Sequence, residues 1–87
     1  MKNQGLDTAI VLSINRDTKQ GVLVGPNDEL LISNSTPSEL LIGDVVKYEF
    51  RCTEKEIEIF NIQKTLFILD DSRLERFFNI LMVSRLW

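Results

Sequence analysis

Histidine is absent from the sequence, and cysteine occurs once, at Cys52. A single cysteine excludes a disulfide within the chain, and a zinc site without histidine would need an unusual all-carboxylate ligand set. Histidine is also the commonest side chain in general acid–base catalysis, and no glycine-rich phosphate loop is present. We therefore expect no metal, no cofactor and no catalytic residues, and we predict that the chain is not an enzyme.

A long apolar run and an excess of positive charge are also missing. No segment approaches the ~20 apolar residues that span a bilayer, and the first residues lack the apolar core of a secretion signal. These absences predict a cytoplasmic protein that does not bind membranes. The chain has 10 basic and 13 acidic residues, a net charge of -3, so its overall field repels polyanions. Any binding of nucleic acid is therefore expected to be weak.

The chain does contain enough apolar residues for one core. Hydrophobic residues make up 44% of its 87 residues and charged residues 26%, the balance of a globular protein. This length lies near the lower limit for a domain that folds without metals or disulfides. We predict one domain over residues 1–87, with a β part at 1–64 and a helix at 70–87.

Five short segments have the composition or the alternation of β-strands. The clearest runs over residues 46–52, where apolar residues at every second position alternate with Lys47, Glu49 and Arg51. In the last segment, Phe60 breaks the alternation and indicates a bulge. A turn is predicted at 25–28, and a loop held to the core by its apolar end at 33–43. The other predicted strands are 9–14, 21–24, 29–33 and 56–59.

A helical period begins after Lys64. Ser72 and Glu75 fit a capping box, so the helix is predicted to run from residue 73 to about residue 87, with Ser72 as its cap. Asp70 and Asp71 add negative charge beside the positive end of the helix. The apolar positions of this helix recur on one side, with Arg85 beside them: Leu74, Phe77, Phe78 and Leu81, flanked by Ile80, Val83 and Trp87.

Several landmarks occur in a characteristic order between about residues 9 and 63. They are Asn15, Asp17 and Gly21 in the first hairpin, residues 28–35, residues 41–46 and residues 48–50. In this order and spacing the chain resembles the cold-shock domain family. That resemblance implies a five-stranded antiparallel β-barrel of the OB type, here followed by the helix. It also implies binding of single-stranded RNA or DNA, whose bases stack on aromatic side chains of the strands.

The aromatic residues that this function needs are missing from the matching positions. Every aromatic residue of the chain lies at Tyr48 or later. Each stacked base contributes about 1 to 3 kcal/mol, so the loss of several aromatics removes most of the expected affinity. The resemblance therefore supports the fold more strongly than the function. The substituted positions are Ser13 and Ile14 in the first strand, Gln20 and Val22 in the first RNA-binding motif, and Leu31 and Ser33 in the second.

Four basic residues are candidate contacts to a nucleic-acid backbone: Arg16, Lys19, Lys47 and Arg51. The alternative is ordinary solvated charge, because acidic residues lie close to them in the sequence and no basic run is formed.

The C-terminal helix carries more apolar area than one stripe against a small barrel needs. The candidates for contact with a protein partner or a second copy are Leu74, Phe77, Phe78, Leu81 and Trp87. The alternative is that the helix closes an open end of the barrel. We predict a non-catalytic binding module that acts through protein–protein contacts in a nucleic-acid-associated or regulatory setting. Weak single-stranded nucleic-acid binding is the first alternative, and a small enzyme is the least favoured.

Overall fold

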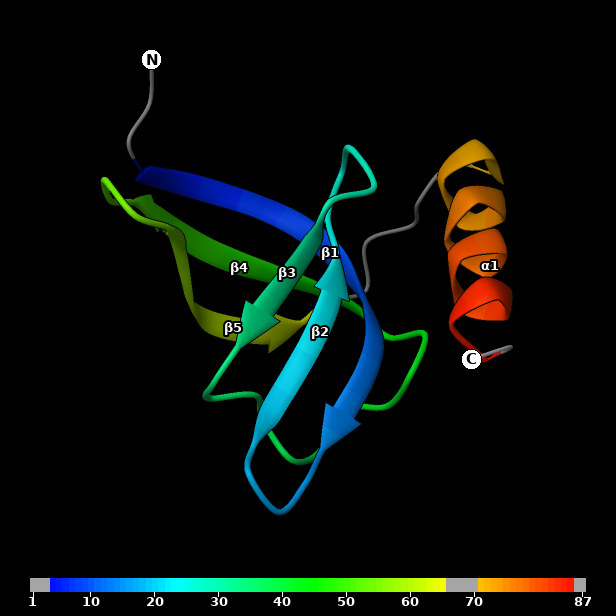
Figure 1. Cartoon of the computed structure of the whole chain (residues 1–87), viewed down its shortest axis with the longest axis horizontal. Coiled ribbons are helices and arrows are strands. Elements are labelled where there is room, and N and C mark those ends of the chain that lie inside the picture. Colours follow the sequence, from blue (N-terminus) through cyan, green and yellow to red (C-terminus); the bar gives the residue numbers. More distant parts are fainter. Residues whose placement is uncertain (1–3, 66–70, 86–87) are drawn as a thin grey trace.

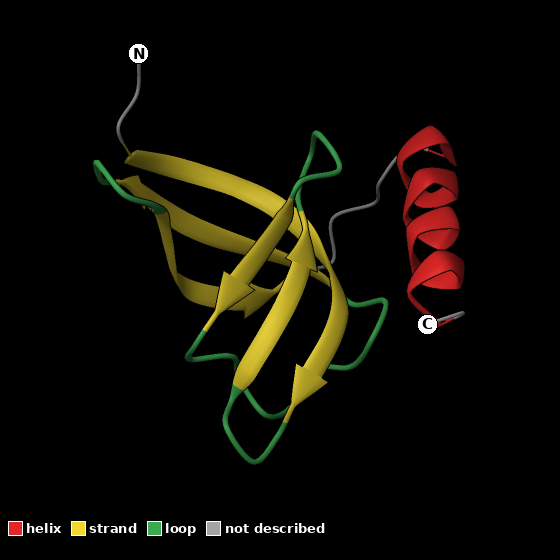
Figure 2. Cartoon of the chain, viewed as in Figure 1, coloured by secondary structure: helices red, strands yellow, loops and turns green. Residues whose placement is uncertain are grey.

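The computed structural model describes residues 4–65 and 71–85, which form five antiparallel strands followed by one helix (Figure 1). The strand order is β3-β2-β1-β4-β5, and the sheet is strongly curled into a half-barrel, which Figure 2 shows in yellow. The prediction of a mainly β fold with a C-terminal helix is confirmed. The elements are β1 (Gln4–Asn15), β2 (Gln20–Val24), β3 (Leu30–Ser33), β4 (Val45–Cys52), β5 (Ile57–Lys64) and α1 (Asp71–Arg85).

The long strand β1 curls the sheet because it pairs with two neighbours. Its first half pairs with β4, from Gln4 opposite Arg51 to Ile10 opposite Val45, and its second half pairs with β2. A register shift just after Val11 marks a bulge, which increases the local twist. The two edge strands, β3 and β5, contact each other, but no hydrogen-bonded ladder joins them within the described ranges. The barrel is therefore half closed.

Alternation along β1 creates two apolar clusters, one on each face of the sheet. Ala9 and Val11 point into the curl, where they join Leu23, Leu40 and Tyr48. On the outer face, side chains of β1 and β2 pack against α1; this second cluster contains Ile10, Leu12, Val24 and Phe77. The helix therefore covers the outer face of the sheet and does not plug the barrel end, as the side-by-side placement in Figure 1 shows.

Two strands are longer than the sequence indicated. β1 begins at Gln4 and not at residue 9, and β5 continues to Lys64 instead of stopping at residue 59. The predicted irregularity in β5 is confirmed, because the β4–β5 register shifts between Lys47 and Glu49 and Asn61 has a positive φ of 51°. The bulge adds one residue to β5, and pairing with β4 then continues to Lys64. Because the alternation breaks at the bulge, the sequence pattern predicted the end of the strand too early.

The β3–β4 loop is fixed to the first hairpin, in agreement with the predicted pinned loop. Leu40 is fully buried in the inner cluster. The Thr36 amide donates a hydrogen bond to the Lys19 carbonyl at 2.9 Å. Arg16 donates from Nη1 to the Ser38 carbonyl and from Nη2 to the Leu40 carbonyl, the latter at 3.1 Å. The loop is therefore held by the core, by the backbone and by one arginine.

The start of α1 differs from the prediction. The helix already includes Asp71, so Ser72 lies in its first turn and the prediction that Ser72 caps it was wrong. The Ser72 hydroxyl instead accepts a hydrogen bond from Arg76 Nη1, one turn later, at 2.8 Å. The acidic Asp71 does lie in the first turn, where it is favourable to the helix dipole. Trp87, at the predicted helix end, lies outside the described residues.

Candidate interaction surface

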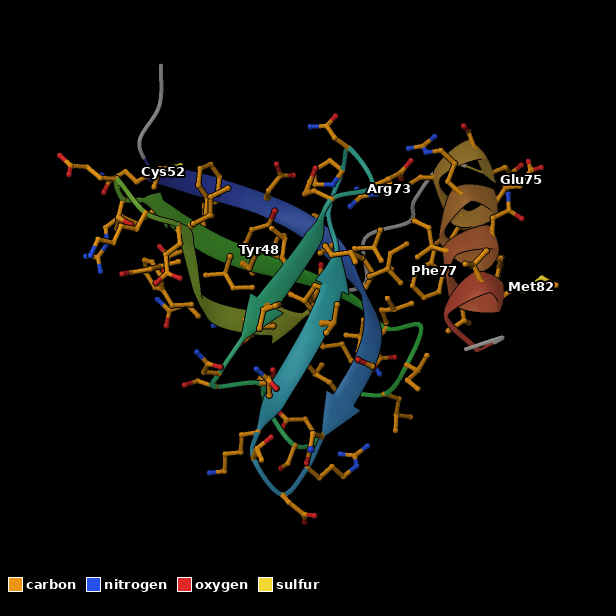
Figure 3. All side chains as sticks on the ribbon, in the orientation of Figure 1. Tyr48, Cys52, Arg73, Glu75, Phe77 and Met82 are labelled. Carbon is orange, nitrogen blue, oxygen red and sulfur yellow. The ribbon has the colours of Figure 1, made fainter. Side chains whose placement is uncertain are left out.

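One side of α1 belongs to the core of the protein. Phe77 is 2% exposed and packs between Ile10, Leu12 and Val24, and Figure 3 shows it pointing from the helix toward the sheet. Leu74 and Leu81 pack partly buried against the same cluster. Of the five residues proposed for a partner contact, these three pack against the sheet, as expected from the alternative in which this side of the helix belongs to the core.

Two arginines fasten the helix to the sheet. Arg73 donates to Thr8 of β1, from Nη1 to Oγ1 at 2.8 Å and from Nη2 to the carbonyl at 2.6 Å. One turn later, Arg76 pairs with Asp28 in the β2–β3 turn, with Nε 3.0 Å from Oδ2. The contacts lie at two separated points of the fold, so they fix both the position and the rotation of α1.

Another side of α1 carries large apolar side chains that the described residues leave more than half exposed. Phe78 is 58% exposed and Met82 is 66% exposed. Glu75 comes before them and Arg85 after them in the sequence, at intervals of three, four and three positions. This spacing places Glu75, Phe78 and Met82 along one side of the helix and position 85 at the edge of that side, next to Leu74. Glu75 and Met82 point away from the sheet in Figure 3. We call Glu75, Phe78, Met82 and Arg85 the outer stripe.

A shallow apolar groove runs beside the outer stripe, between α1 and β3. Its volume is about 390 Å³, and its walls include Leu12, Leu30, Ile80 and Val83. Leu30 and Val83 are both exposed. The apolar surface of the helix is thus continuous with apolar side chains of the strand.

The four candidate nucleic-acid contacts do not meet in one place. Lys47 and Arg51 lie on β4 opposite Thr8 and Gln4, whereas Arg16 and Lys19 lie in the hairpin beyond Asn15. Thr8 and Asn15 are about 23 Å apart along the strand. Arg16 holds loop carbonyls, and Arg51 forms an ion pair with Glu58. Of these four residues, only Lys19 and Lys47 have exposed side chains for which no hydrogen bond or ion pair is described.

The positions of the family's stacking residues do not form an open platform here. Val22 packs against the apolar cluster beneath α1. Leu31 and Ser33 are buried, with Leu31 in the cluster inside the curl. The residues that β3 exposes are Leu30 and Ile32, neither of them aromatic. Bases would therefore meet no aromatic ring at these positions, although Ser13 and Gln20 are exposed.

Metal-binding side chains do not cluster in the described part of the chain. Residues 4–65 and 71–85 hold no group of three or more His, Cys, Asp or Glu side chains that could bind a metal ion. The alternation over residues 46–52 places Cys52 on the apolar side of its strand, but its side chain is exposed because it is the last residue of β4. Within the same residues, no helix has the length and apolar character required to cross a membrane.

The chain matches no family model, no curated protein and no solved structure. The resemblance to cold-shock domains therefore depends on the landmark residues alone. The structure supports its coarser part, a small curled sheet of five antiparallel strands. Function has to be inferred from the surface itself, because a fold does not specify an activity.

Proposed function

We propose that the chain is a non-catalytic binding module that acts through protein–protein contacts made by the outer stripe of α1. The observation that carries this proposal is the exposure of Phe78 and Met82 on a helix whose other side is fixed to the sheet. Burial of such a side chain contributes roughly 1.5 to 3 kcal/mol. A partner that covers both residues would gain this energy without moving the helix.

The partner that fits the outer stripe best is a second copy of the chain. In an antiparallel pair of α1 helices, the alignment that sets Phe78 against Met82 of the second copy also sets Glu75 against Arg85 of the second copy. Two-fold symmetry repeats each contact, so the interface contains two apolar contacts and two opposite-charge contacts. In the sequence, the positions of the stripe run from the acidic Glu75 through Phe78 and Met82 to the basic Arg85, an order that is complementary to itself only in the antiparallel orientation.

Charge exchange gives a sharp test of this pairing. Sedimentation equilibrium of the wild-type chain is expected to show a monomer–dimer equilibrium. Glu75→Arg and Arg85→Glu each place like charges at both ends of the interface, so each variant alone is expected to dimerise more weakly. An equimolar mixture restores both opposite-charge contacts and is expected to form a heterodimer.

Two results would overturn the proposal of a second copy. One is a wild-type chain that remains monomeric throughout the concentration series. The other is a mixture of the two variants that associates no more strongly than either variant alone. Exchange of the exposed Asp17 for Asn, far from α1 in the β1–β2 hairpin, serves as the control and is expected to leave the dimerisation constant unchanged.

A further inference from the structure

The mouth of the half-barrel contains a pocket that is separate from the outer stripe. Its volume is about 350 Å³, and its lining comes from β1, from the β2–β3 turn and β3, and from β4 and β5. Barrel mouths are common ligand sites because they combine an apolar floor with polar groups at the rim. The lining residues that matter below are Asp7, Glu29, Leu31, Tyr48, Phe50 and Ile57.

Strand register brings the first of these groups together. Asp7 of β1 lies directly opposite Tyr48 of β4, and both side chains belong to the face that points into the curl. Side chains of such cross-strand pairs are in direct reach of each other. Gly5 lies opposite Phe50, and a Cβ at Gly5 would be 3.1 Å from Phe50 Cζ. The missing side chain thus lets the Phe50 ring lie over β1 beside the pocket.

Tyr48 supplies a polar atom at the floor of the pocket. Its side chain lies within the curl of the sheet in Figure 3 and is 4% exposed. Within the described residues, its hydroxyl has no hydrogen-bond partner. The hydroxyl oxygen is also not one of the fully buried polar atoms without a partner, so a ligand in the pocket can reach it. Burial raises the pKa of Tyr48 well above its ordinary value, and the negative charges of Asp7 and Glu29 add to this effect against the opposing charge of Arg73. The Tyr48 hydroxyl is therefore neutral and makes no hydrogen bond to the described residues.

Two carboxylates give the pocket its charge. One oxygen of each is engaged locally: Asp7 Oδ1 accepts the Thr8 amide at 2.8 Å, and Glu29 Oε2 accepts the Asn27 amide at 3.1 Å. The second oxygen of each carboxylate has no hydrogen-bond partner in the part of the chain that the structure describes. No lysine or arginine is among the described residues that line the pocket. The pocket thus combines negative charge, an unpaired hydroxyl and apolar walls.

We propose that this pocket binds an organic cation, an alkylammonium or guanidinium group on an apolar stem. Asp7 and Glu29 accept hydrogen bonds from its N–H groups, and the Tyr48 hydroxyl oxygen accepts another. Phe50, Leu31 and Ile57 contact the stem, and an aromatic ring adds attraction for the positive charge. A bare metal ion fits less well, because calcium and magnesium require more oxygen ligands than these walls offer.

The same chemistry occurs in a free amine and in a lysine or arginine side chain of a protein, so the test uses both sources. Tyr48 is the sole tyrosine of the sequence, and NMR of a chain labelled in its tyrosine ring therefore reports on this pocket alone. The probes are n-butylguanidinium and N-acetylarginine methylamide, with the neutral isostere n-butylurea for comparison. Saturable shifts of the Tyr48 ring are expected with either or both cations and not with butylurea.

Binding of the blocked arginine alone would identify a protein side chain as the ligand, and binding of both cations would include free guanidinium compounds. Asp7→Asn and Glu29→Gln keep the shape of each side chain and remove its charge, so each is expected to weaken cation binding at least tenfold. The control variant Asp17→Asn keeps the wild-type affinity. The proposal is overturned if neither cation shifts the ring, if butylurea binds equally well, or if Asp17→Asn weakens binding as much as the pocket variants do.

The pocket and the outer stripe are tested by different measurements. Cation binding is read from the Tyr48 ring, whereas self-association is read from sedimentation. The charge-exchange variants at Glu75 and Arg85 are expected to bind the cation like the wild-type chain. Failure of one proposal therefore leaves the other intact.

Discussion

Arg73 and Thr8, 65 positions apart in the sequence, are joined by two hydrogen bonds. The guanidinium of α1 reaches both the hydroxyl and the carbonyl of Thr8, with distances of 2.8 and 2.6 Å. Thr8 lies on the strand that pairs with both β2 and β4. The contact therefore couples the helix to the centre of the sheet.

Removal of the Arg73 guanidinium is expected to destabilise the fold more than removal of the neighbouring Arg76 guanidinium. Hydrogen bonds that involve a charged group contribute about 1.5 to 3 kcal/mol, so Arg73→Ala should lower the free energy of unfolding by that amount. The Arg76–Asp28 ion pair has side chains that are 42% and 36% exposed. Because solvent screens such a pair, Arg76→Ala should cost less than about 1 kcal/mol.

Urea unfolding followed by circular dichroism measures both variants, with the wild-type chain as reference. The two residues lie about one turn apart on the same helix, so the small gain of helix propensity on Arg→Ala is common to both and cancels in the comparison. Equal destabilisation by the two substitutions would contradict the assigned role of the Arg73–Thr8 contact.

Phe77 and Phe78 are neighbours of the same residue type, yet their replacement is expected to affect different properties of the protein. Phe77 is buried in the cluster beneath α1, so Phe77→Ala should lower the free energy of unfolding by about 3 to 5 kcal/mol. Phe78→Ala removes an exposed ring and should change the stability of the monomer by less than about 1 kcal/mol. The second variant should instead raise the dissociation constant of the dimer.

Urea unfolding at low protein concentration gives the monomer stabilities, and sedimentation equilibrium gives the dissociation constants. The wild-type chain is the reference in both measurements. Strong destabilisation of the monomer by Phe78→Ala would contradict the exposure of this ring. Unchanged dimerisation of the same variant would contradict the proposed interface.

Tyr48 is expected to make the fold less stable at high pH. Burial raises its pKa in the folded chain, with Asp7 and Glu29 adding to the shift and Arg73 opposing it. In the unfolded chain the phenol ionises near its usual value of about 10. Above that pH the unfolded state loses a proton that the folded state keeps, so the free energy of unfolding falls as the pH rises toward the folded pKa.

Absorbance at 295 nm follows ionisation of this sole tyrosine directly. Ionisation is expected to coincide with unfolding and not to precede it. The Tyr48→Phe variant keeps every lysine and should lose the part of the alkaline stability decrease that belongs to the phenol. Free ionisation of the folded chain near pH 10 would rule out this role.

Nucleic-acid binding is expected to be undetectable or very weak. Fluorescence anisotropy with mixed single-stranded RNA and DNA at low salt should show no saturable binding, because the basic residues are dispersed and two of them are engaged. Lys19→Gln and Lys47→Gln should leave this result unchanged. Micromolar binding that salt weakens steeply and that these variants reduce would instead establish a polyanion-binding surface.

Part of the fold could be predicted from local patterns. Residues 46–52 alternate in the sequence and form most of β4, because alternation of burial is a property of each residue and its two neighbours. The first residues of β1 carry no such pattern and are held by pairing with β4. In β5 the bulge at Asn61 interrupts the alternation, so the continuation to Lys64 depended on pairing across the sheet.

The candidate sites could be predicted only in part. Helical spacing placed Phe77 and Phe78 together on an apolar side of the helix, and the sequence contains no information on which of them meets the sheet. The contacts of Arg73 with Thr8 and of Arg76 with Asp28 fix the rotation of α1 and so decide that Phe77 meets the sheet. The mouth pocket gave no signal in the sequence, because Asp7 and Tyr48 become neighbours only through the β1–β4 register.

By itself the sequence determined the class of this protein: mainly β with a terminal helix, without a histidine for acid–base work and without aromatic residues in the first three strands. These properties follow from composition and from the periods of two and 3.6 residues, which are local. Only the tertiary structure decided that α1 covers the outer face of the sheet, leaves Phe78 and Met82 exposed and leaves the barrel mouth open. Such outcomes depend on contacts between residues far apart in the chain, which no local pattern encodes.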